Sequence, residues 1–397
     1  MKLIIVIFSL LFSVFSFSQN IKRIIDKNDI KALTNYCNDV DIIEVQIPIL
    51  ADDKKYYPVS ALVYATKKEK FELVKTLISH KEKLVDFDNQ LAIAFDVAIM
   101  EQHTKLINYL FKLKPNVNQI CELCGHQNAI MLAVLNGGQD LFFKINTNSE
   151  YNLINVDSNN LYHLIGQEKE RFNIKIFEDI KTNNNIDINL INVFGRTPLQ
   201  VSARQGNDTL FFELLKLDAM HNELNDFYID AIVGKSDRIY NYVRTLFKSS
   251  PNWGLVKNRK DDGNTLHPIE YAIKFNNTKV TKLIYKEMFA EVLKDNDAEK
   301  IKILVDVLGS RQMENDQFWP LWEVINLLNK DLFQFLVTEI DKLNDLNIEF
   351  TSYNKFIDGD YTENAEVLFT KFEYRSAKRR FGKNYVKGLY KKLNIKF

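Results

Sequence analysis

The chain has 397 residues, and its 52 Lys and Arg balance 52 Asp and Glu, so the formal net charge is zero. This balance excludes a polyelectrolyte surface over the whole molecule, although local charged patches remain compatible with it. Three cysteines in a chain of this length are too few for a disulfide scaffold, so apolar packing must hold the fold together.

The N-terminus has the order of a secretory signal. Met1 and Lys2 form a short basic start, an apolar run follows from Leu3 to about Phe15, and serines precede a cut after Ser18. A membrane anchor or a buried first strand is the alternative, but the run is shorter than the ~20 residues that a bilayer span needs. We therefore expect residues 1–18 to be a signal peptide and the mature protein to be exported, as a periplasmic or secreted protein.

Similar segments recur about every 33 residues in the first half of the chain. Residues 60–65, Ser-Ala-Leu-Val-Tyr-Ala, return 33 positions later as residues 93–98, and again as residues 128–133. Each copy leads to a second apolar stretch, such as Leu77-Ile78 or Leu110-Phe111. This pattern predicts a series of short helix pairs.

Between two of these pairs lies the run Cys121-Glu122-Leu123-Cys124-Gly125-His126, the one compact cluster of reactive residue types. We expect Cys121 and Cys124 to form a local disulfide or a redox-labile thiol pair. Unpaired thiols in a turn, or half of a zinc site with His126, are the alternatives. A closed zinc site takes four ligands, and the βαβ context of a thioredoxin-like enzyme is absent.

The clearest copy of the repeat spans residues 192–219. It contains Gly195-Arg196-Thr197-Pro198-Leu199-Gln200-Val201-Ser202-Ala203, then Gly206, then Leu214-Leu215. Thr197 is a good helix cap, and a proline in the next position suits the first turn, where no amide partner is needed. Gly195 suits a turn with positive φ, and Gly206 suits a left-handed helix end.

This unit resembles the ankyrin repeat, whose signature is G-x-T-P-L-H-x-A-A followed by a glycine and a closing Leu-Leu. The resemblance implies an all-α fold, an ankyrin-type helical solenoid of about nine helix-hairpin units with short β-hairpin fingers, over residues 19–345. Each unit of such an array packs only on its neighbours. An irregular all-helical domain or a tetratricopeptide array is the alternative.

Beyond the clearest copy the spacing becomes irregular. Ala231 to Val243 is expected to form one helix pair, and His267-Pro268 opens another that reaches Ile284. Two more pairs are expected at Val292–Val305 and Trp319–Leu336.

Residues 346–397 are expected to be a C-terminal extension with a basic end. Lys371 to Phe397 carries ten Lys or Arg against the single Glu373. Phe381, Tyr385 and Leu389 recur at every fourth position, which predicts an apolar stripe on one basic amphipathic helix. We expect this helix to cap the solenoid, while weak contact of residues 371–397 with an anionic membrane is the alternative. Nucleic acid is not expected as a partner.

We expect a protein-binding module rather than an enzyme, with no cofactor and no metal. No G-x-S-x-G elbow, H-E-x-x-H pair or Walker loop occurs. An envelope-associated protein held by its basic helix, or a redox protein using Cys121 and Cys124, is the alternative.

In the family that the repeats resemble, partners dock on the concave side, which finger tips and first helices form. The resemblance assigns to that side the residues at the ends of first helices, namely Lys67, Lys68, Met100, Glu101, Leu135, Asn136, Arg204, Gln205, Lys274 and Phe275. It also places fingers around Asn89, His126, Asn159, Phe194 and Asn264.

Overall fold

The computed structural model describes residues 20–50, 54–167, 169–182, 185–247, 256–257, 265–295, 311–312, 317–318, 324, 327–345 and 371–392. This part of the chain is predominantly helical, which confirms the all-α prediction. The chain divides into two compact units, Met1–Val193 and Phe194–Phe397. The expected signal peptide, residues 1–18, lies outside the described residues.

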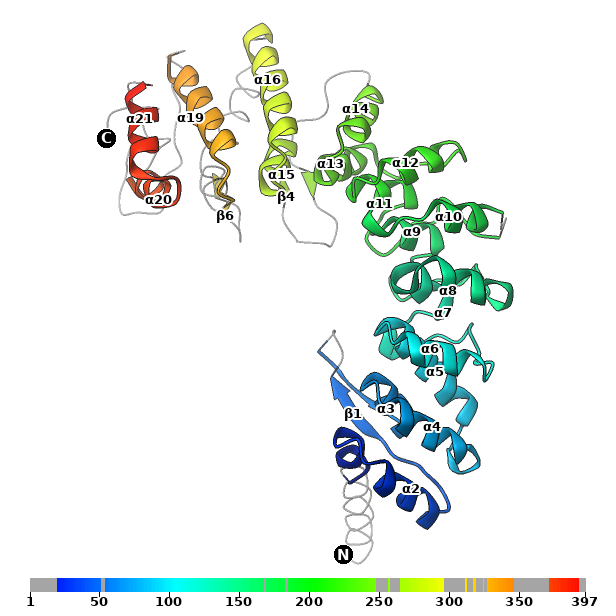
Figure 1. Cartoon of the computed structure of the whole chain (residues 1–397). Coiled ribbons are helices and arrows are strands. Elements are labelled where there is room, and N and C mark those ends of the chain that lie inside the picture. Colours follow the sequence, from blue (N-terminus) through cyan, green and yellow to red (C-terminus); the bar gives the residue numbers. More distant parts are fainter. Residues whose placement is uncertain are drawn as a thin grey trace, which may run out of the picture. The chain divides into compact units, whose positions relative to one another are not determined.

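In the first unit, helix pairs follow one another in chain order (Figure 1). After α2 (Ile30–Asp39) come α3 (Ala61–Lys67) with α4 (Phe71–Ser79), α5 (Phe87–Met100) with α6 (Thr104–Phe111), α7 (Ala129–Leu132) with α8 (Gly138–Ile145), and α9 (Leu161–Gly166) with α10 (Ile174–Lys181). A wider helical turn, Ala133–Gly137, continues α7. The first helix of one pair packs on the first helix of the next, as α3 does on α5 and α5 on α7.

The second unit repeats this arrangement. Its pairs are α11 (Pro198–Arg204) with α12 (Asp208–Leu215), α13 (Leu224–Gly234) with α14 (Asp237–Thr245), and α15 (Pro268–Lys274) with α16 (Thr278–Asp295). Helix α13 packs on both α11 and α15. The helices α19 (Lys330–Asp345), α20 (Lys371–Phe381) and α21 (Lys383–Lys392) follow.

Local side-chain caps explain where several of the first helices begin. Thr197 accepts a hydrogen bond from the amide of Gln200, whose side chain in turn accepts one from the Thr197 amide. Asn160 and His163 form the same reciprocal arrangement at the start of α9. Such caps satisfy amides that the helix itself leaves unpaired. The predicted roles of Thr197 and of the adjacent proline are confirmed.

Gly206 closes helix α11 in the left-handed region, at φ +62°, as its sequence position predicts. A Cβ at this position would lie 2.1 Å from the carbonyl oxygen of Gly234 in α13. Glycine is therefore required here for two reasons, the backbone conformation and the close approach of the next helix pair.

Short antiparallel hairpins lie in front of several first helices. Strands β1 (Ile47–Leu50) and β2 (Tyr56–Val59) pair ahead of α3, and β3 (Val256–Lys257) pairs with β4 (Thr265–Leu266) ahead of α15. A further hairpin joins β5 (Arg311–Gln312) to β6 (Gln317–Phe318). We call the connection in front of a first helix a finger.

Three boundaries expected from the sequence are wrong. Helix α5 begins at Phe87, so Asn89 lies in a helix and not in a finger. Helix α16 runs on to Asp295, so no new pair starts at Val292. The basic end forms two helices instead of one, because the chain turns at Gly382, which has φ +96°. Asn264 and residues 346–370 lie outside the described residues.

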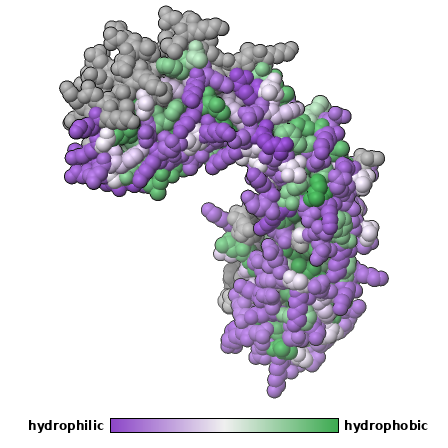
Figure 2. Space-filling view, turned by 45° about the horizontal axis from the view of Figure 1, so that its top comes forward, coloured by the Kyte–Doolittle hydropathy of each residue, from purple (hydrophilic) through white to green (hydrophobic). Residues whose placement is uncertain are grey.

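Hydrophilic residues cover most of the surface visible in Figure 2, and hydrophobic residues appear there as separate patches. No helix within the described ranges is long and apolar enough to cross a membrane.

Candidate binding site

The predicted residues of the first unit lie at the C-terminal ends of successive first helices. Lys67 Nζ lies 2.6 Å from Glu101 Oε1, which joins the end of α3 to the end of α5. Arg171 Nη1 donates to the carbonyl oxygen of Leu135 at 2.7 Å and to Asn136 Oδ1 at 3.2 Å. Equivalent positions of successive pairs therefore line up as neighbours. Lys68 is exposed, whereas Lys67, Met100, Glu101, Leu135 and Asn136 are half-buried.

In the second unit, Arg204 is tied to its neighbours on two sides. Its Nη1 donates to Asp230 Oδ1 at 3.1 Å, and its guanidinium carbon lies 5.7 Å from the centre of the Phe275 ring. Gln205 is exposed, and Lys274 and Phe275 are half-buried. Two of the predicted residues, Arg204 and Phe275, are thus in contact, but part of the Arg204 side chain serves to neutralise a buried acid.

The Cys121 finger, residues 121–127, is a small closed turn. The Cys121 amide donates to the Gln127 carbonyl oxygen at 2.9 Å, and a disulfide joins Cys121 to Cys124 across a Cα separation of 5.2 Å. Gly125 and His126 both adopt positive φ, which reverses the chain. Cys121 and Cys124 are 1% and 4% exposed, whereas Glu122 between them is exposed. The expected position of this cluster, between two helix pairs, is confirmed.

One cavity lies beside this finger on the side of the predicted helix ends. This His126 cavity has a volume of about 620 Å³. Its wall combines Lys67, Met100 and Glu101 from the ends of α3 and α5 with Leu123, Cys124 and His126 of the Cys121 finger, and with Val156 of the next finger. The apolar part of the wall therefore comes from Met100, Leu123 and Val156, with charged groups around it.

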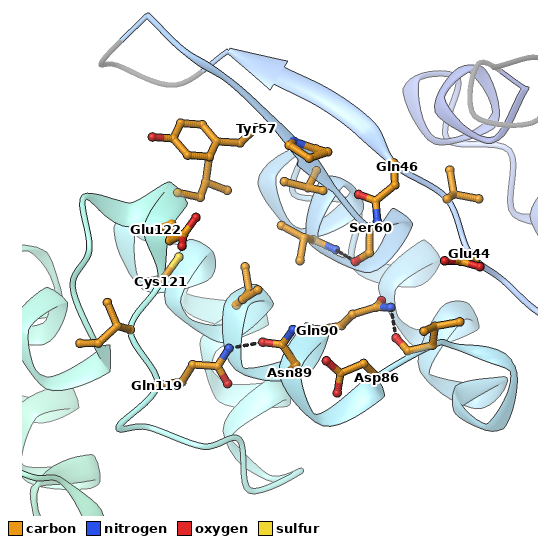
Figure 3. Close-up of a pocket in the computed structure, with 18 residues that line it drawn as sticks. Glu44, Gln46, Tyr57, Ser60, Asp86, Asn89, Gln90, Gln119, Cys121 and Glu122 are labelled. Atoms are coloured by element: carbon orange, nitrogen blue, oxygen red, sulfur yellow. Dashed lines mark hydrogen bonds between the residues drawn. The ribbon is translucent and has the colours of Figure 1, made fainter. Parts of the chain in front are cut away.

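A second cavity, which we call the acid-lined cavity, lies on the other side of the same finger (Figure 3). It has a volume of about 490 Å³ and is lined by residues 44–46 ahead of β1, by strand β2, by the start of α3, by the first half of α5 and by the Cys121 finger with the two residues before it. Its charged lining residues are Glu44, Asp86 and Glu122, and no Lys, Arg or His is among the described residues that line it. The other polar residues of its wall are the amides Gln46, Asn89, Gln90 and Gln119 and the hydroxyl-bearing Tyr57 and Ser60.

The two cavities share a wall. Tyr57, Glu122 and Leu123 line both of them, so Glu122 stands at the boundary between an acidic cavity and a mainly apolar one. The sequence pattern pointed to the Cys121 finger, which contains Glu122, and to the helix ends, but not to Glu44 or Asp86, nor to the meeting of the three acids. These three residues are far apart in the chain and meet only in the folded unit.

A patch of exposed aliphatic residues continues from the His126 cavity along the next two fingers. Val156 lines that cavity and is 58% exposed, and Ile154, Ile191 and Val193 are 49%, 47% and 37% exposed. The Val193 amide donates to the Asp157 carbonyl oxygen at 2.9 Å, which holds the two fingers together. This aliphatic patch was also missed, although each finger shows the same pattern of apolar, Asn, apolar in the sequence.

Asp96 is a buried acid in α5, close in sequence to the residues of this helix that line the acid-lined cavity. It is 1% exposed, and neither carboxylate oxygen has a hydrogen-bond partner among the described residues. Burial raises the pKa of Asp96 well above its usual value.

The part of the chain that the structure describes contains no group of three or more His, Cys, Asp or Glu able to hold a metal ion. Compared with known proteins, the chain matches no family model and no curated sequence.

Proposed function

We propose that this chain is an exported binding module that holds an extended segment of a partner protein across the Cys121 finger. The observation that carries the proposal is the pair of cavities on either side of Glu122, continuous with the exposed aliphatic patch. Volumes of about 490 and 620 Å³ fall within the range of ligand pockets, roughly 300–1,000 Å³. Exposed apolar residues rimmed by polar groups are typical of interaction surfaces.

The chemistry of the two cavities suggests the partner. Three carboxylates and no described cation favour a Lys or Arg side chain in the acid-lined cavity. Met100, Leu123 and Val156 favour an apolar side chain in the His126 cavity. We therefore infer a partner segment with a basic residue close to an apolar one.

The scaffold is, in this proposal, a stack of degenerate ankyrin-type units. Bonds between equivalent positions support it, since Lys67 and Glu101 are 34 residues apart, Asn173 and Gln139 are 34 apart, and Asn192 and Asn159 are 33 apart. In a repeat array each unit packs only on its neighbours, which leaves a long surface free for binding. Because Cys121 and Cys124 are buried, we assign their disulfide to bracing the finger and not to redox catalysis.

A displayed library of random peptides tests this proposal. Selection on the wild-type chain should enrich sequences in which Lys or Arg stands close to an apolar residue. Their affinity, measured by calorimetry, should fall at least about tenfold in Glu122→Lys, because the shared wall would then repel the basic side chain. Glu82→Lys is the matched control, since Glu82 is an exposed acid of the same unit outside both cavities. Equal affinity for the two variants would refute the site.

A further inference from the structure

The C-terminal helices α20 and α21 turn one side inward. Ala377, Phe381, Val386 and Leu389 are 0%, 4%, 0% and 7% exposed. The Phe381 ring centre lies 5.1 Å from that of Phe333 in α19, and the Tyr385 hydroxyl donates to the Lys330 carbonyl oxygen at 3.2 Å. The apolar side of this helix pair therefore already has a partner, which is the preceding helix of its own unit.

Cations occupy the outward side of the same two helices. We call this the basic face, and it comprises the exposed residues Arg375, Arg379, Arg380, Lys383, Lys387 and Lys391. None of the six makes an ion pair with another described residue. Within residues 371–392 of the sequence, Glu373 is the single acid. The chain is neutral as a whole, so its C-terminal end is a concentrated positive patch.

We propose that the basic face is a second binding surface, distinct from the partner site, that attaches the protein to an anionic lipid membrane by charge alone. An interfacial helix that inserts into a bilayer does so with its apolar side. Here that side is packed against α19, so only the cations are available. Attraction to anionic headgroups increases with each basic residue near the surface and disappears within a Debye length.

One observation, together with the export expected from the sequence, favours lipid over nucleic acid as the anionic partner. Single-stranded nucleic-acid sites combine cations with aromatic rings on which bases stack. In this helix pair the Phe381 ring is buried, and Lys330 Nζ lies 5.4 Å from the centre of the Tyr385 ring. Both rings therefore already contact groups of the protein itself. The secretory signal expected at the N-terminus also favours a membrane surface.

Vesicle co-sedimentation with the full chain tests the proposal. Vesicles of a zwitterionic lipid, with or without about 30% of an anionic lipid, separate charge-driven attachment from binding by any other segment. The anionic-dependent binding should be strong at about 50 mM salt and lost at about 500 mM, because exposed charges are screened. The variant Arg379→Gln, Arg380→Gln, Lys383→Gln, Lys387→Gln should lower it at least about tenfold.

The matched control removes four exposed lysines of the first unit, Lys27→Gln, Lys31→Gln, Lys81→Gln and Lys175→Gln, and should stay within about twofold of wild type. Both variants keep the buried residues of α20 and α21, so their helical circular dichroism should match wild type. Anionic-dependent binding that survives 500 mM salt, or that both variants lose equally, overturns the proposal. Tighter binding to a single-stranded oligonucleotide than to anionic vesicles at the same salt overturns it in favour of nucleic acid.

Discussion

Helices α5 and α13 are both first helices of their pairs, and each buries an aspartate, but the two acids have different surroundings. Asp230 Oδ1 accepts from Arg196 Nε at 2.9 Å and from Arg204 Nη1 at 3.1 Å. Asp96 has no hydrogen-bond partner in the described part of the chain. Burial raises the pKa of both carboxyls, and for Asp230 the two guanidinium groups offset part of that rise.

The comparison shows two ways of tolerating a polar group in the stack. In α13 a buried charge is paired, so the acid links its own helix pair to the preceding one, which carries Arg196 and Arg204. In α5 the acid has no such partner, so burial raises its pKa and favours the neutral form, at a cost in stability. The α5 region instead carries a covalent brace nearby, the Cys121–Cys124 disulfide.

The largest expected change in the free energy of unfolding comes from removing the two arginine partners of Asp230. The double variant Arg196→Met, Arg204→Met should lower the free energy of unfolding by about 3–5 kcal/mol, because a buried carboxylate would lose both counter-charges. Adding Asp230→Asn should restore most of that loss. Urea unfolding followed by circular dichroism measures both. Little loss in the double variant would show that the pairing is not what makes α13 tolerate its acid.

Removing the unpaired acid Asp96 should raise the free energy of unfolding instead of lowering it. Asp96→Val should raise the free energy of unfolding at neutral pH by about 1–3 kcal/mol, because a buried polar group without partners is replaced by an apolar one. Val63, which is buried at the corresponding position of α3, shows that the stack accepts valine there. Asp88→Val, an exposed acid on the same helix, is the control and should change stability by less than about 0.5 kcal/mol. A destabilised Asp96→Val would contradict this picture.

The stabilisation by Asp96→Val should also depend on pH. A carboxyl whose pKa is raised on folding adds no pH-dependent cost to stability while it is protonated in both the folded and the unfolded state, below about pH 4. As pH rises from there towards the raised native pKa, the unfolded chain loses the proton while the folded one keeps it, and wild type loses up to about 1.4 kcal/mol per pH unit. The difference between variant and wild type should therefore grow from pH 4 to pH 7. A difference that is constant over this range would show that Asp96 titrates normally.

Removing the Cys121–Cys124 disulfide should change the free energy of unfolding least. A disulfide that closes only the turn from Cys121 to Cys124 should stabilise by about 1–2 kcal/mol on chain-entropy grounds. The variant Cys121→Ser, Cys124→Ser should lower the unfolding free energy by that amount and leave the helical circular dichroism unchanged. Loss of helical structure in this variant would mean that the finger supports the stack itself.

The features that local chemistry determines were predictable. The cap at Thr197 and the left-handed end at Gly206 follow from residues within one turn, and both are confirmed. The boundary of α5 was not predictable from the repeat phase, because residues 87–92 contain no Gly or Pro to stop a helix and so extend it backwards. Gly382, in contrast, ends a helix. The apolar stripe of Phe381, Tyr385 and Leu389, expected on one helix, is therefore divided between α20 and α21.

The candidate site was predictable only in part. Lys67 and Met100 are 33 residues apart and hold the same position in successive units, and Glu101 follows Met100 directly, so a repeat places the three together; all three line the His126 cavity. Glu44, Asp86 and Glu122 share no such position, and their meeting around one cavity depends on contacts between segments that are distant in the chain, such as the bridge between Ile43 and Leu84. The lack of a partner for Asp96 could not be predicted either, because it depends on the absence of arginine from neighbouring helices.

In the proposed function, a partner segment lies along the fingers of the first unit. The most direct test is to place a photo-crosslinking amino acid at Val156 in one variant and at Ile174 in another, and to irradiate each with the peptide selected on the wild-type chain. Val156 is an exposed finger residue and Ile174 an exposed residue of a second helix, at 58% and 43% exposure. We predict an adduct with the Val156 variant and none with the Ile174 variant. Equal adducts, or an adduct at Ile174 alone, would contradict the account.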